Sequence, residues 1–210
     1  MTRVVLAILL AASEVGQAAS PPESDRPEQA AATMSLLAGI SLHLEPPGRL
    51  SCRHDDDSPE TFLALDVVGL PSVDTAGTQI VYSRRATASE GGETVIAIRR
   101  VDAMPARCGE EQILVWGGGS PDRPVLSPDG DRVVFTWGRT GIASLWQIAT
   151  TGGDPEQLTN RGLETLSRNP GEAPRGFLPP PMSPPTISGS PDRLVLEWET
   201  PTGPHSLVLP

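Results

Sequence analysis

The amino-acid sequence predicts an all-β protein made of repeated units of four short antiparallel strands. The 23 Pro and 21 Gly among 210 residues exclude long helices, because each internal Pro removes a backbone donor and clashes with the preceding turn. The stretch 120–160 has the pattern of four short strands separated by tight turns. Weaker versions of the same pattern occur before and after it, so the chain is expected to be a repeat protein.

The best-defined unit, 120–160, begins with a first strand near 124–126. Its next strand, 132–137, is rich in β-branched and aromatic residues, and 144–148 alternates in a strand pattern. A short outer strand is expected near 156–159. Pro fixes φ and Gly tolerates the closing conformation in the β-turn between the first two strands, which consists of Ser127, Pro128, Asp129 and Gly130.

A second unit is expected over about 71–116. Gly77 falls on Gly130 and Tyr82 on Phe135 at a constant separation of 53 residues. The run beginning at Glu111 matches the run beginning at Glu156 at a separation of 45. About eight extra residues are therefore expected in this copy, and the acidic, Gly-containing loop 86–93 is the simplest place for them, because loop insertions cost little.

A third unit is expected over 186–210, after a Pro-rich insertion at 161–185. Arg193 falls on Arg132 and Trp198 on Trp137. The sequence stops without an outer strand. A segment from the N-terminal region could pair there and close the ring. If nothing pairs there, this unit has an unpaired edge, which favours self-association.

The residues before the second unit are less regular. Strands at 40–44, 50–52 and 61–65 would make a fourth unit, although no turn signature accompanies them. The segment 19–40 is expected to be flexible or to form a short helix over 25–40, because Pro27 suits a first helical turn and Ala follows. The main domain is thus expected over 41–210. An ordinary β-sandwich with similar hairpins is the alternative.

The unit at 124–160 resembles the WD-like repeat of TolB-type β-propellers. The Ser127–Gly130 turn, the strand ending in Phe135-Thr136-Trp137, the Gly152-Gly153 turn and the final Leu158-Thr159-Asn160 carry the resemblance. It implies four-stranded blades around an axis, an exported setting and binding to other proteins. Closed propellers need at least four blades, whereas three are recognisable here, so the array is expected to be incomplete or small.

The N-terminus predicts a secretory signal peptide over 1–18. Arg3 precedes the apolar run 4–12, and Gly16-Gln17-Ala18 fits small-x-small cleavage. The run is too short to span a bilayer. The mature protein is expected to be periplasmic or extracellular, without membrane insertion. A buried N-terminal strand is the alternative.

Charge and cysteine content narrow the partners and the compartment. The net charge of −10 argues against nucleic acid, because phosphate repels an acidic chain. Cys52 and Cys108 are the two cysteines, and export permits a disulfide between them. Two separate buried thiols are the alternative.

No catalytic, cofactor-binding or metal-binding residues are expected. The acidic run after His54, Asp55–Asp57, lacks the spacing of a calcium loop and is interpreted as solvated. There is no Gly-x-Ser-x-Gly, no phosphate loop and no Cys-x-x-Cys. A platform for stacking sugars or peptides is the alternative to blade packing for the four Trp. Packing between blades is expected for Tyr82, Phe135, Trp137, Trp146 and Trp198.

The sequence therefore predicts an exported, non-enzymatic interaction module with an unknown protein partner. A fragment of a larger repeat protein without independent activity is the alternative. A secreted hydrolase or metal-binding protein is a remote third possibility.

Overall fold

The computed structural model describes residues 31–54, 59–91, 93–104, 106–160, 178, 181–182, 184–190 and 193–209. Strands account for almost every regular element of these residues, and the remaining one is the single 3-10 turn η2 (Leu37–Gly39). The predicted all-β class is therefore confirmed. The expected signal peptide at 1–18 and most of the Pro-rich insertion lie outside the described residues.

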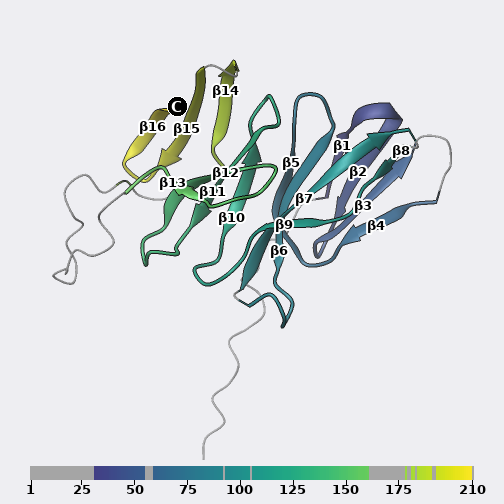
Figure 1. Ribbon diagram of the computed structural model, residues 1–210, viewed down its shortest axis with the longest axis horizontal. Helices are drawn as coiled ribbons and strands as arrows, with labels where there is room; N and C mark the ends of the chain where they lie inside the picture. Colours follow the sequence, from purple (N-terminus) through teal and green to yellow (C-terminus); the bar gives the residue numbers. More distant parts are fainter. Residues whose placement is uncertain are drawn as a thin grey trace, which may run out of the picture.

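The strands form four successive antiparallel sheets, called blades 1 to 4 here (Figure 1). Blade 1 contains β1 (Ala32–Ser35), β2 (Ile40–Glu45), β3 (Arg49–His54) and β4 (Thr61–Ala64). Blade 2 contains β5 (Val67–Val73), β6 (Gln79–Arg85), β7 (Thr94–Ala103), β8 (Ala106–Cys108) and β9 (Gln112–Val115). Blade 3 contains β10 (Asp122–Leu126), β11 (Arg132–Trp137), β12 (Ser144–Ala149) and β13 (Glu156–Gln157). Blade 4 contains β14 (Thr186–Ser190), β15 (Arg193–Thr200) and β16 (Gly203–Leu209).

Blade 1 supplies the fourth unit that the sequence indicated only weakly. The helix expected over 25–40 is wrong in its described part, because β1 pairs with β2 from Ala32 opposite Leu44 to Ser35 opposite Ser41. The side chains of Ala32 and Met34 then pack against the core. Tertiary pairing and burial thus override the local helical preference of this segment.

The first hairpin of blade 2 repeats that of blade 3. The amide of Gly77 donates to the carbonyl oxygen of Asp74 (3.0 Å), and the amide of Gly130 donates to that of Ser127 (2.9 Å). Both glycines have φ near +70°, at 69° and 75°. The separation of 53 residues seen in the sequence is therefore a structural equivalence.

The insertion expected in blade 2 is divided between two places. Val81 pairs with Ile98, 17 residues further on, whereas the equivalent Val134 pairs with Gln147, 13 further on. Four extra residues therefore belong to the loop 86–93.

The other extra residues lengthen β7 and add β8. Ile98 pairs with Gln112, 14 residues further on, whereas Gln147 pairs with Glu156, nine further on. Gln112 thus stands where Glu156 does, so the outer strands are related by 44 residues and the predicted 45 is wrong by one. The extension is a hairpin in which Val101 pairs with Cys108.

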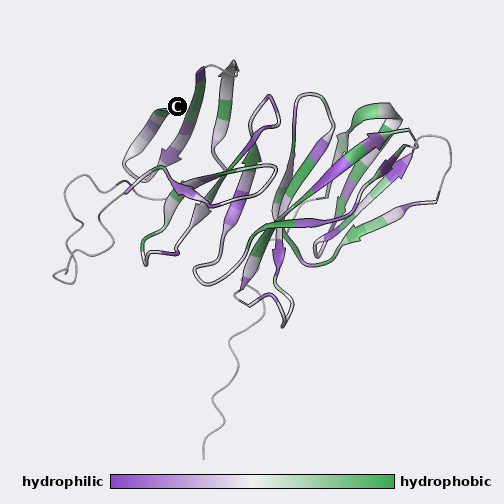
Figure 2. Cartoon of the chain, viewed as in Figure 1, coloured by the Kyte–Doolittle hydropathy of each residue, from purple (hydrophilic) through white to green (hydrophobic). Residues whose placement is uncertain are grey.

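Apolar cores fill the spaces between adjacent blades. Three clusters of buried side chains lie between blades 1 and 2, between blades 2 and 3, and between blades 3 and 4. Figure 2 shows hydrophobic and hydrophilic residues alternating along the strands, as expected when one face of a sheet is buried. Blades 1 and 4 lie at opposite ends of the row in Figure 1, so the described blades form an open array.

Candidate functional site

The outer edge of blade 4 is the first candidate site. Within the described residues this sheet has three strands, and β16 pairs with β15 on one side only. β16 is seven residues long (Gly203–Leu209) and contains no Asp, Glu, Lys or Arg. Natural edge strands are usually short or carry charges or Pro that hinder pairing with other chains. The outer strands β4 and β13 have four and two residues. β16 is longer and carries Pro204 near its start but no charge, and no described strand covers its outer edge.

The face of blade 4 that points away from blade 3 is polar. Leu194, Leu196 and Trp198 of β15 point into the core, so the residues between them point outward. These outward residues include Glu197 and Glu199, both exposed. A face of this kind is suited to water and needs no further sheet to cover it. The outward face is therefore a less suitable docking surface than the edge.

The outward face of blade 1 is also polar. The Ser51 hydroxyl donates to the carboxylate of Glu60, and the guanidinium of Arg49 lies 5.8 Å from the centre of the Phe62 ring. The hydrogen bond from Ser51 lowers the pKa of Glu60. Polar outer faces on terminal repeats keep an open array soluble.

A cavity of about 500 Å³ lies across the three strands of blade 4 and reaches β16. Trp198 and His205 are among the residues that line it, and their rings stack with centroids 5.6 Å apart. The His205 Nε2 atom lies 3.2 Å from the hydroxyl of Thr200. The cavity extends along β16 from Pro204 to Ser206, so recesses for partner side chains lie beside the open backbone.

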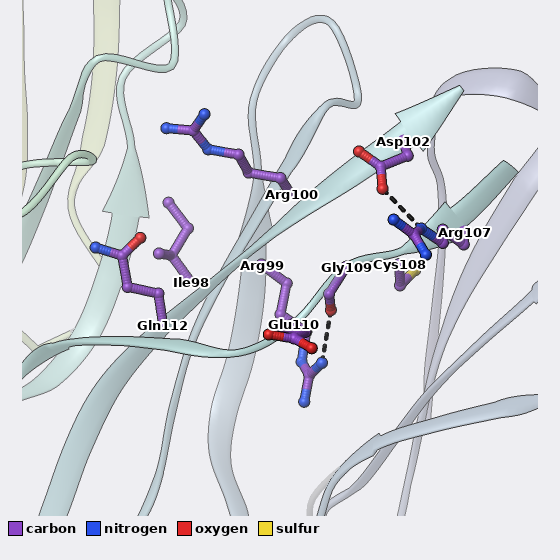
Figure 3. Close-up of a pocket in the computed structure, with 9 residues that line it drawn as sticks. All are labelled: Ile98, Arg99, Arg100, Asp102, Arg107, Cys108, Gly109, Glu110 and Gln112. Carbon is purple, nitrogen blue, oxygen red and sulfur yellow. Dashed lines mark hydrogen bonds and ion pairs between the residues drawn. The ribbon is translucent and has the colours of Figure 1, made fainter. Parts of the chain in front are cut away.

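A second cavity, of about 520 Å³, lies in blade 2 and is lined by residues of β7, β8 and β9 and of the segment between β8 and β9. Figure 3 shows Arg100 and Gln112 on one side of it and the Asp102–Arg107 ion pair on the other. Arg100 is exposed and has no ion pair with another described residue. The cavity offers a guanidinium and an amide, which suit a carboxylate or a backbone carbonyl of a partner.

The third arginine that lines this cavity, Arg99, forms its hydrogen bonds within the protein. Arg99 donates to the carbonyl oxygens of Gly109 (2.7 Å) and of Leu63 in blade 1 (2.7 Å). It also donates to the hydroxyl of Tyr82 (3.0 Å). Arg99 therefore ties the outer strand of blade 2 to blade 1.

Tyr82, itself buried, belongs to a partly buried polar network beneath the outer strand. Its hydroxyl donates to Glu111 (2.5 Å), and Arg84 forms ion pairs with Glu111 (2.6 Å) and Glu90 (2.7 Å). Burial, followed by the hydrogen bond to Glu111, raises the pKa of Tyr82. Burial raises the pKa of Glu111. The interactions with Arg84 and Tyr82 lower this pKa by a larger amount, so the net shift is downward. These groups hold one another in place.

The aromatic residues expected to pack between blades are all buried, with Tyr82 and Phe135 fully so. The indole of Trp146 donates to the carbonyl oxygen of Trp137 (3.2 Å), and the two rings meet edge to face at 5.2 Å. Trp198 lies in the core between blades 3 and 4. Trp116, by contrast, is 62% exposed.

The turn Ser127, Pro128, Asp129 and Gly130 has a role that sequence reasoning missed. The carbonyl oxygen of Gly130 accepts hydrogen bonds from Gln79 Nε2 of blade 2 (2.8 Å) and from the hydroxyl of Thr150 (2.9 Å). A Cβ at residue 130 would lie 2.5 Å from Gln79 Nε2. The glycine is thus required both for its φ and for the approach of the neighbouring blade.

Cys52 and Cys108 form a disulfide, with their Cα atoms 6.7 Å apart. Cys52 is on β3 and Cys108 on β8. The added hairpin of blade 2 therefore carries the covalent link to blade 1.

Among the described residues, no cluster of three or more His, Cys, Asp or Glu side chains is arranged to hold a metal. Asp55–Asp57, next to His54, lie outside the described residues. The part of the chain that the structure describes has no helix with the length and apolar character needed to cross a membrane.

Neither the family models nor the curated proteins searched contain a match to this chain. Solved structures similar to it include a TolB-type protein of Agrobacterium tumefaciens (16% identity, 81% of this chain and 60% of that one, TM-score 0.47). TolB of Acinetobacter baumannii (12%, 82% and 52%, 0.42) is also similar. A third is the β-propeller domain of the trilobed protease of Pyrococcus furiosus (8%, 84% and 51%, 0.42), described as having an open velcro topology.

This chain spans 51 to 60% of the length of those three structures. The four successive antiparallel sheets themselves carry the assignment of a β-propeller-like fold.

Proposed function

We propose that this chain is an exported, non-enzymatic β-propeller-like module that binds another protein through the free edge of blade 4. The supporting observation is the seven-residue, uncharged strand β16, which is unpaired on its outer side within the described residues. An extended partner segment adds to such an edge through main-chain hydrogen bonds, and adjacent pockets supply specificity. The cavity beside β16 offers such a pocket.

Three further observations support the proposal. Blade 2 contains three ionisable side chains that interact strongly with one another, namely Tyr82, Arg84 and Glu111. Because they bond to one another, their role is structural. The disulfide between Cys52 and Cys108 suits an oxidising compartment outside the cytoplasm. The sequence 1–18 has the order of regions found in a secretory signal.

Cross-linking of the tagged full-length protein in intact cells, followed by recovery, tests the binding role. We expect a distinct cross-linked partner with the natural chain and about tenfold less of it with Val208→Lys, which places a charge on the free edge. Ser188→Lys is the matched control, because Ser188 is exposed on the same face of the same sheet but lies on β14. Equal recovery with both variants would contradict the proposal.

Export is tested separately by determining the N-terminus of the protein outside the cytoplasm. We expect it to begin after Ala18. A protein that keeps Met1 and remains in the cytoplasm would contradict this part of the proposal.

A further inference from the structure

We propose that the partner at the free edge of β16 is a second copy of this chain, paired strand to strand across a twofold axis. This inference rests on the proposed function, because it names the occupant of the same edge. The resulting dimer would contain one continuous sheet of six strands, three from each copy, and would have the self-complementary interface that twofold dimers require.

Pro204 fixes which residues face the free edge. Hydrogen-bonded and non-hydrogen-bonded pairs alternate along an antiparallel ladder. β15 and β16 are joined by a two-residue turn, with Thr200 opposite Gly203 and Glu199 opposite Pro204. Pro has no N–H to donate, so in an edge strand it occupies positions whose backbone nitrogen faces away from the neighbour. Pro204 and, by alternation, Ser206 and Val208 therefore direct their backbone groups outward.

These outward groups pair with a copy of themselves when the axis passes through Ser206. Ser206 then lies opposite Ser206 of the second copy, and each donates its amide to the carbonyl of the other. Val208 lies opposite Pro204 of the second copy, and its amide donates to the Pro204 carbonyl. The same bond forms on the other side of the axis. The Val208 carbonyl of each copy receives no bond from the other copy, because Pro204 has no N–H.

The side chains favour the same arrangement. Val208 is 53% exposed, and this pairing places it against the apolar ring of Pro204 from the other copy. β16 contains no charged residue, so no like charges meet across the axis. The outer strand of blade 3, β13, has only two residues, one of which is Glu156, and β4 of blade 1 has four. Of these three outer strands, β16 therefore offers the longest uncharged edge.

Sedimentation velocity of the purified full chain over a range of concentrations tests the dimer. We expect a reversible dimer whose Kd rises by about tenfold or more with Val208→Lys, equal to about 1.4 kcal/mol. Ser188→Lys should leave Kd unchanged. Circular dichroism melts of both variants check that the lysines do not unfold the protein. A chain that stays monomeric at its highest soluble concentration, or a dimer unaffected by Val208→Lys, overturns the inference.

An engineered cysteine tests the register. Ser206→Cys is expected to give a disulfide-linked dimer on oxidation, because residue 206 faces its own copy, whereas Ser188→Cys should remain monomeric on a non-reducing gel. Absence of the linked dimer for Ser206→Cys contradicts this register.

The two proposals can fail separately. A monomeric chain whose cross-linked partner is lost with Val208→Lys keeps the binding role and removes the self-pairing. A dimer without any other partner shows that the edge is used by the chain itself.

Discussion

The junctions at the two ends of the array are held in different ways. Between blades 1 and 2, the disulfide is accompanied by the hydrogen bond from Arg99 to Leu63 and by a cluster of 13 buried residues. Between blades 3 and 4 the cluster has six buried residues among those that the structure describes. The amide of Leu178 donates to the Asn160 side chain there (2.7 Å), and Arg123 donates to the carbonyl of Pro181.

This difference shows that similar blades need not be equally anchored. Stability in stacked repeats is approximately a sum of terms from neighbouring units, so the smaller junction should open first. Blade 4, which has the free edge, is also the blade attached by the smaller apolar core. The part of the molecule most available for pairing is therefore the part expected to move most easily.

Removal of the disulfide should have the largest effect. The double variant Cys52→Ser, Cys108→Ser loses a bond that closes 56 residues of chain, which is worth up to about 4 kcal/mol of unfolding free energy in the chain-entropy model. Chemical denaturation with and without reductant measures this loss. Reductant should destabilise the natural chain and leave the variant unchanged. If the natural chain is insensitive to reductant, the covalent link does not account for the stronger junction.

Truncation of Trp198 should have the next largest effect. Its ring is 5% exposed within the small cluster between blades 3 and 4, so Trp198→Ala should cost about 3 kcal/mol or more. Hydrogen exchange should show loss of protection in 186–209 while blade 1 stays protected. Trp116→Ala is the matched control: Trp116 is 62% exposed, and its removal should change stability by less than about 0.5 kcal/mol. Uniform loss of protection along the chain would contradict the weaker anchoring of blade 4.

The smallest expected change in stability comes from removing an ion pair of blade 2, Arg84–Glu90. The hydrogen bond from Arg84 lowers the pKa of Glu90 from its ordinary value of 4.5 to about 2. Because the folded pKa lies below the unfolded one, the stabilisation is present above pH 4.5 and is lost as the pH falls towards 2.

Glu90→Gln should therefore lower stability at neutral pH, by less than about 1 kcal/mol because solvent screens this pair. The same substitution should have no effect near pH 2, and thermal melts at both pH values measure the difference. Glu93→Gln, in the same loop, is the control, since Glu93 accepts a hydrogen bond from Ser120 but has no ion pair with a described residue. An equal loss at both pH values would show that Glu90 acts through packing.

The repeated hairpins were predictable from the sequence because their signals are local. Gly77 and Gly130 occupy the same left-handed position, and the apolar residues that follow remain in phase. Within the described residues blade 4 has no strand outside β16, which agrees with the absence of an outer strand from the repeat pattern. The helix expected over 25–40 was not borne out in its described part, because pairing of β1 with β2 is a tertiary interaction.

Interactions between side chains of neighbouring blades could not be predicted from the sequence. Gln79 and Arg99 bridge neighbouring blades through long side chains, and no local pattern marks such a residue. The separation of the Cys52 and Cys108 Cα atoms depends on where the β7–β8 hairpin lies. The sequence placed all the extra residues of blade 2 in the loop 86–93, whereas the β7–β8 hairpin contains part of them and carries Cys108.

The position of the disulfide along the chain also sets an order of assembly. Both cysteines and all the strands of blades 1 and 2 precede Asp122, where blade 3 begins. In a chain that emerges from its N-terminus, the first two blades can become a covalently closed unit before any later blade is available. Blade 3 can then fold against a surface that is already formed, and blade 4 packs against blade 3 after that, without a further disulfide among the described residues.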